Sequence, residues 1–245
     1  MNQVRIALVL LLLSPGAAFA KAPKAPTWHY LAEESVDVFA AIPGPPGIRS
    51  AKNKAEIAAV LERQKTRTAA DIARARWEEE PSPVDFDTVL GKRFNAVHFP
   101  VTFALLENAA SDADNISGTA KKYWGRPRPP LQNLGIHPVV PVPSSFSYPS
   151  GHAIRGMVWA IILAKLDPAE KAGLMARGGQ IGDDRIMAGV HFPTDVADGQ
   201  RLGRFIAAQL LANPRFKRDF RRAKAEFTPA AKYAGGFAFA RFALN

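Results

Sequence analysis

Three short clusters of basic, histidine and small residues stand out in the second half of this 245-residue sequence. In chain order they are Lys121-x6-Arg128-Pro129, Pro149-Ser150-Gly151-His152 and Arg185-x5-His191-x3-Asp195. Two histidines, three separated cations, one carboxylate and a Ser-Gly turn are the groups needed to transfer a phosphoryl group through a covalent intermediate. The residue types and their spacing therefore indicate phosphatase chemistry.

His191 and Asp195 form the pair that suggests a nucleophile. His191 lies two residues before Pro193, which can open a helix whose N–H groups would favour a bound anion. Asp195 falls in the first turn of that helix, where it can hold one imidazole nitrogen and leave the other free to attack phosphorus. Taken alone, the pair also fits a solvent-facing histidine beside an acidic helix start.

His152 follows the Ser150-Gly151 turn at the start of an apolar segment. A histidine held on such a rigid element could donate a proton to the leaving oxygen, while the preceding N–H groups face an anion. Each of these residues also has a structural interpretation, as a helix cap, a turn glycine or a packed histidine. The cations Lys121 and Arg128 could converge on one anion, and Arg185 could face the same pocket, although isolated basic residues are usually solvated.

Taken together, the clusters resemble the signature of the type 2 phosphatidic acid phosphatase superfamily, which reads Lys-x6-Arg-Pro, Pro-Ser-Gly-His and Ser-Arg-x5-His-x3-Asp. Arg128 with Pro129 fits the first element, whereas Arg126 with Pro127 does not. One position departs from the pattern, because Asp184 stands where the family has serine. We expect this carboxylate to lie close to the phosphate site and to weaken phosphate affinity or alter its pH dependence.

The chain most resembles the bacterial class A non-specific acid phosphatases of this superfamily, and the specific likeness covers about residues 100–205. The resemblance implies an all-helical, metal-independent acid phosphomonoesterase that needs no cofactor and works through a phosphohistidine. It implies that His191 is the nucleophile, Asp195 its orienting partner, and His152 the acid and later the base. It also implies a set of residues that bind the phosphate oxygens: Lys121, Arg128, Ser150, Gly151, His152 and Arg185.

The substrate stays open, because relatives with the same constellation hydrolyse lipid phosphates or are vanadium-dependent haloperoxidases. Small phosphomonoesters are the predicted substrates, no nucleic acid is required, and vanadate is a predicted inhibitor. A peripheral lipid-phosphate phosphatase is an alternative, because the basic C-terminal run could rest on an anionic membrane. The net charge of +10 by itself also allows a non-catalytic periplasmic polyanion-binding protein. The oligomeric state, a homo-oligomer included, is left undecided.

The N-terminus predicts export. Residues 1–20 carry Arg5, an apolar run over residues 6–13 and a small-x-small ending at Ala20, which together are typical of a cleaved signal peptide and predict a periplasmic location. No later segment is apolar over the length that a membrane span needs. The sequence has no cysteine, so core packing has to stabilise the predicted mature domain, residues 21–245.

The elements that must position the three clusters all have helical periodicity, which predicts an all-α fold with one compact multi-helix domain. A helix starting at Ser150 is apolar nearly all round and should be the buried central one. Gly199 and Gly203 predict a close helix crossing. The other predicted helices cover residues 50–80, 86–97, 100 to about 124, 168 to about 178, 180–190 and from 193 onward, with a short one within residues 31–41.

Overall fold

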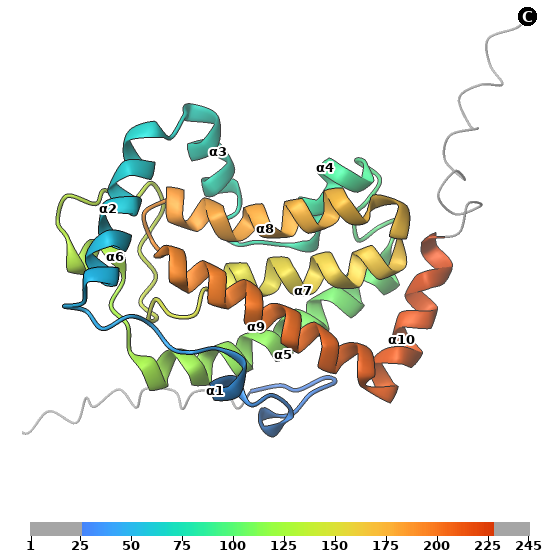
Figure 1. Cartoon of the computed structure of the whole chain (residues 1–245). Coiled ribbons are helices and arrows are strands. Elements are labelled where there is room, and N and C mark those ends of the chain that lie inside the picture. The colour runs from blue at the N-terminus through green and yellow to red at the C-terminus, as the bar shows by residue number, and fades with distance from the viewer. Residues whose placement is uncertain (1–25, 228–245) are drawn as a thin grey trace, which may run out of the picture.

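Helix α7 (Gly151–Leu166) is the centre of the structure, a computed structural model in which residues 26–227 are described. It packs against three long helices that surround it in Figure 1: α5 (Pro100–Trp124), α8 (Lys171–Met187) and α9 (Pro193–Ala212). Because α7 is apolar on nearly all sides, it must be covered on nearly all sides. The predicted all-α fold and buried central helix are confirmed.

Shorter elements complete the described range, which contains no strand. The remaining α-helices are α1 (Val38–Ala41), α2 (Ala51–Thr66), α3 (Ala69–Trp77), α4 (Asp87–Leu90), α6 (Pro129–Gln132) and α10 (Pro214–Lys224). Single 3-10 turns occur at Glu33–Ser35, Pro83–Phe86, Pro168–Glu170 and Ala225–Phe227. Within residues 26–227, no helix combines the length and apolar character needed to cross a membrane. The predicted signal peptide lies outside the described residues.

The antiparallel course of α7, α8 and α9 brings the three sequence clusters to one end of the bundle. The start of α7, the end of α8, the start of α9 and the end of α5 all lie at the left of Figure 1, next to α2. Local signals set these boundaries: Ser150 caps α7 by accepting from Ala153 N–H at 3.4 Å, and Gly125 ends α5 in the left-handed conformation at φ 56°.

Glycines allow the backbones of these helices to approach closely. A Cβ atom at Gly199 of α9 would lie 2.8 Å from the Ser150 carbonyl oxygen, which confirms the predicted crossing. The prediction that a helix ends near Gly178 and Gly179 is wrong, because α8 runs through both. Gly178 meets the backbone of Gly156 on α7, so it serves close packing and not chain reversal.

The segment over residues 50–80, expected as one long helix or a broken one, is broken between α2 and α3, where Thr68 and Asp71 form a capping box. Another boundary differs from the sequence prediction. The helix expected over residues 86–97 is limited to α4, because Gly91 has a φ of 83° that a helix cannot continue.

Candidate active site

His191 is buried between the end of α8 and the start of α9. Its Nδ1 lies 3.2 Å from Asp195 Oδ2, and its Nε2 lies 3.1 Å from Arg128 Nη1. Because a carboxylate accepts and a guanidinium donates, Nδ1 carries the proton and Nε2 presents its lone pair. Burial lowers the pKa of His191 to about 3, although the hydrogen bond to Asp195 acts in the opposite direction. The imidazole is therefore neutral through most of the acid range.

Asp195 is fully buried and accepts hydrogen bonds on both oxygens. Arg126 Nη1 donates to Oδ1 at 2.6 Å, while Phe192 N–H donates to Oδ2 at 2.8 Å and the Ser147 hydroxyl also donates to Oδ2. Burial alone would raise the pKa of Asp195, but the bond and charge of His191, together with Arg126, hold it at about 2. The ionised carboxylate is thus positioned to orient the imidazole.

Arg126 connects this pair to α2. Its Nη2 donates to Asn53 Oδ1 and Glu56 Oε2, each at 2.7 Å, and its guanidinium lies 4.0 Å from the centre of the Phe192 ring. Glu56 in turn accepts from the N–H of Thr194 at 2.6 Å, in the first turn of α9. The buried arginine therefore ties α2 to the segment that carries His191 and Asp195.

Three cations lie around His191. Arg128 is held by the carbonyl oxygens of Ser145 and Val190, each at 2.8 Å, and burial lowers its pKa to about 10. Lys121 Nζ donates to the Phe146 carbonyl at 2.8 Å, and burial, followed by the charge of Arg128, lowers its pKa to about 7. These positions keep both side chains next to His191.

Arg185 is the most buried of the cations, with 1% of its surface exposed. Its Nη1 donates to the Ala75 carbonyl across a long 3.4 Å, and its Nε has no hydrogen-bond partner within residues 26–227. A buried donor without a partner is destabilising by about 1–3 kcal/mol. Such a group in a cavity fits a ligand that brings oxygen atoms.

His152, at the start of α7, faces the turn that follows α3. Its Nε2 lies 3.0 Å from the carbonyl oxygen of Glu78 and 3.2 Å from that of Glu79. Since carbonyls only accept, Nε2 carries a proton and Nδ1 is the nitrogen free to exchange one. Burial, with the charge of Arg185, lowers the pKa of His152 well below its ordinary value.

A cavity of about 370 Å³ joins these groups. From the predicted site it is lined by Lys121, Arg128, Gly151, His152, Arg185 and His191. Asp195 lies behind His191, and the Ser150 side chain is occupied in capping α7, so neither lines the cavity. The arrangement can hold a phosphoryl group between a neutral imidazole nitrogen and a second histidine, with three cations around its oxygens.

Comparisons with known proteins point to a phosphatase family. The family model described as PAP2 superfamily matches residues 100–219. These residues form a PAP2 superfamily domain. The chain is 26% identical over 224 residues to a non-specific acid phosphatase of Providencia stuartii, covering 84% of this chain and 88% of that protein. It is 30% identical over 158 residues to an acid phosphatase of Zymomonas mobilis, covering 60% of this chain and 57% of that one. The predicted family and the phosphatase class are confirmed.

A solved structure shares the fold of the PAP2 domain. The crystal structure of a bacterial vanadium-dependent iodoperoxidase matches with a TM-score of 0.55 and 16% identity, covering 70% of this chain and 51% of that one. At this identity the likeness concerns the helical architecture alone.

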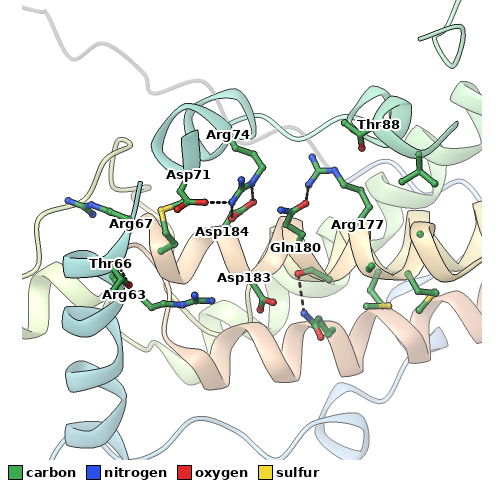
Figure 2. A pocket seen from close by; sticks show the side chains of 18 of the residues that line it. Arg63, Thr66, Arg67, Asp71, Arg74, Thr88, Arg177, Gln180, Asp183 and Asp184 are labelled. Atoms are coloured by element: carbon green, nitrogen blue, oxygen red, sulfur yellow. Dashed lines mark hydrogen bonds and ion pairs between the residues drawn. The ribbon is translucent and has the colours of Figure 1, made fainter. Parts of the chain in front are cut away.

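Asp184, which stands where the family pattern has serine, does not lie where the sequence predicted. Asp184 does not line the catalytic cavity, because its carboxylate accepts from Arg74 Nε at 2.6 Å and Arg74 Nη2 at 2.7 Å in a separate groove of about 740 Å³ (Figure 2). Successive residues on a helix point about 100° apart, so Arg185 can face the cavity while Asp184 faces away. The expectation that this carboxylate lies beside the phosphate site is wrong.

Arg126, Ser147 and Glu56 were not among the predicted site residues. Arg126-Pro127 repeats the Arg-Pro pair of Arg128-Pro129 two residues earlier, but Arg126 lies behind His191 and pairs with Asp195, whereas Arg128 lines the cavity. Ser147 and Glu56 carry no sequence signal, because their relation to Asp195 and Thr194 arises only from packing between distant segments.

Proposed function

We propose that this chain is a periplasmic acid phosphatase that hydrolyses small phosphate monoesters through a phosphohistidine at His191. The observation that carries the proposal is the buried His191, whose Nδ1 is held by Asp195 and whose Nε2 faces a cation-lined cavity. The likeness to proteins named acid phosphatases supports the same reaction.

In the first step the phosphoryl oxygens are bound by Lys121, Arg128 and Arg185 and by N–H groups at the start of α7. His191 Nε2 attacks phosphorus, so that an N–P bond forms as the P–O bond to the alcohol breaks. His152 Nδ1–H gives its proton to the departing oxygen. Arg128 Nη1, which contacts Nε2 at 3.1 Å, transfers its hydrogen bond to a phosphoryl oxygen.

In the second step a water molecule attacks the phosphohistidine. His152 Nδ1 accepts the proton of that water, the N–P bond breaks, and phosphate leaves with His191 neutral again. The negative charge of the bound phosphoryl group lies beside His152 and raises the pKa of that ring above the low value that burial and Arg185 impose. Substrate binding thus prepares the acid that the first step needs.

The decisive experiment is rapid quench with substrate labelled on phosphorus. A phosphoenzyme that is labile in acid and stable in base should accumulate in the wild-type protein and be absent from the His191→Ala variant. His137→Ala is the matched control, because His137 is exposed and does not line the cavity. A labelled protein of equal yield in the His191→Ala variant would exclude this nucleophile.

The charge needed to stabilise the transferring group is supplied in this proposal by Lys121, Arg128 and Arg185, without a metal ion. Turnover of p-nitrophenyl phosphate should therefore persist after dialysis against EDTA. Loss of turnover that zinc or magnesium restores would contradict the proposal. Cell fractionation of the exporting host tests the periplasmic location.

The physical form of the substrate distinguishes a small-substrate phosphatase from the alternative, a peripheral lipid-phosphate phosphatase. Comparing a soluble short-chain phosphatidic acid with the same headgroup in anionic vesicles tests whether a membrane surface accelerates hydrolysis. Equal rates for both forms favour the small-substrate enzyme, whereas a large gain on vesicles favours the peripheral lipid phosphatase.

A further inference from the structure

Two exposed carboxylates line the same cavity as the catalytic histidines. Glu79 and Glu80 follow α3 in the turn that leads to Pro81, and all three residues line the cavity. The turn is anchored at the site, because the carbonyl oxygens of Glu78 and Glu79 both accept from His152. Within the part of the chain that the structure describes, neither Glu79 nor Glu80 forms an ion pair with a lysine or arginine at contact distance.

Two positive charges of the cavity lie at its buried end and two negative charges lie at its exposed end. Arg128 and Arg185, at the deep end, are 3% and 1% exposed, whereas Glu79 and Glu80 are exposed. Burial lowers the pKa of Arg185, and the negative charges of Glu78, Glu79 and Glu80 act in the opposite direction. A phosphoryl group bound at the cationic end therefore directs the alcohol part of its ester toward the two carboxylates.

Arg155 and Asp114 also line the cavity, but their charges are paired with each other. Arg155 Nε donates to Asp114 Oδ1 at 2.8 Å, and both residues line the catalytic cavity and an adjoining hollow of about 290 Å³. Because Arg155 and Asp114 pair with each other, Glu79 and Glu80 are the lining carboxylates that have no ion-pair partner among the described residues. Glu107 also lines the adjoining hollow, and as a carboxylate it brings no positive charge there.

We propose that Glu79 and Glu80 make this phosphatase prefer phosphomonoesters whose alcohol carries a positive charge, such as an aminoalkyl phosphate, over those whose alcohol carries a second anionic group. The inference rests on the proposed function and deepens it by naming the substrate class. Attraction between exposed charges is weak, so the expected preference is about 2- to 5-fold for each charge contact. It should fall at high salt, where such contacts are screened within about 3 Å at 1 M.

The test compares kcat/KM for three primary alkyl phosphates that differ in the charge of the alcohol: O-phosphoethanolamine, glycerol 1-phosphate and 3-phosphoglycerate. At low ionic strength we expect that order of preference, with each step about 2- to 5-fold. In the Glu79→Gln/Glu80→Gln variant, the kcat/KM values for the three substrates should become nearly equal. Glu33→Gln/Glu34→Gln is the matched control, since it removes the same charge from two exposed glutamates that do not line the cavity, and it should keep the order.

The outcomes separate this inference from the proposed function. If p-nitrophenyl phosphate is hydrolysed but the three alkyl phosphates are equal, or their order survives in the Glu79→Gln/Glu80→Gln variant, the selectivity role is overturned and the phosphatase stands. If no phosphomonoester is hydrolysed by the full chain, the proposed function fails and the inference with it.

Discussion

Arg126 Nη1 donates to Asp195 Oδ1 across 2.6 Å, and the two side chains are only 1% and 0% exposed. The same arginine pairs with Glu56 at 2.7 Å, so one buried cation serves two carboxylates. Removing a single partner from such a group leaves buried charges without compensation. The orientation of His191 thus depends on a residue that does not line the catalytic cavity.

Replacing Arg126 by glutamine should lower the free energy of unfolding by about 3 kcal/mol, because Asp195 and Glu56 lose their buried counter-charge. Urea unfolding measures the change. Arg93→Gln, at an exposed position, should stay within about 0.5 kcal/mol of wild type. If both variants are equally stable, the buried network does not hold this end of the bundle together.

Asp195→Asn tests the orienting role of the carboxylate. An amide can present its own N–H to His191 Nδ1 and favour the tautomer with a proton on Nε2, which removes the attacking lone pair. We expect kcat for p-nitrophenyl phosphate to fall about 10²- to 10⁴-fold, as in other enzymes where a buried aspartate sets a histidine tautomer. KM should change much less. A variant with nearly unchanged kcat would remove Asp195 from the mechanism.

Acid should destabilise the fold through His191. The unfolded chain binds a proton on this histidine below its ordinary pKa of 6.5, whereas the folded chain binds it only near pH 3. Between these values the unfolded state holds more protons, so stability is present above about pH 6.5 and is lost as the pH falls toward 3. His152 acts in the same direction.

The measurement for this acid effect is urea unfolding at pH 7 and pH 4, which bracket most of the window. His191→Gln, which has no titrating ring, should lose less stability between the two conditions than wild type. The same slope in both proteins would show that His191 is not responsible for the acid effect.

Orthovanadate should bind tightly because it can become five-coordinate and copy phosphorus between the attacking and leaving groups. His191 Nε2 would fill the apical position, and Arg128 and Arg185 would bind equatorial oxygens. Calorimetric titration should show that His191→Ala abolishes tight binding and that Arg185→Ala weakens it strongly. Arg93→Ala, at an exposed position, is the control and should bind like wild type. Equal affinity in wild type and His191→Ala would exclude a covalent site at this residue.

The sequence by itself determined the fold class, the central helix and the residues of the three clusters. These features are readable because their causes are local. Helical periodicity marks α7 as buried, Pro193 and Ser150 mark helix starts, and the spacing from His191 to Asp195 spans one helical turn.

Only the tertiary structure decided which groups complete the site. The link from Arg126 to Glu56 joins residues 70 positions apart, and no local pattern encodes a contact at that separation. The direction of Asp184 toward Arg74, the continuity of α8 through Gly178 and the placement of Glu79 at the cavity mouth also depend on how helices pack. Side-chain direction and burial are properties of that packing, because a helix sequence specifies its own faces but not the neighbour that each face will meet.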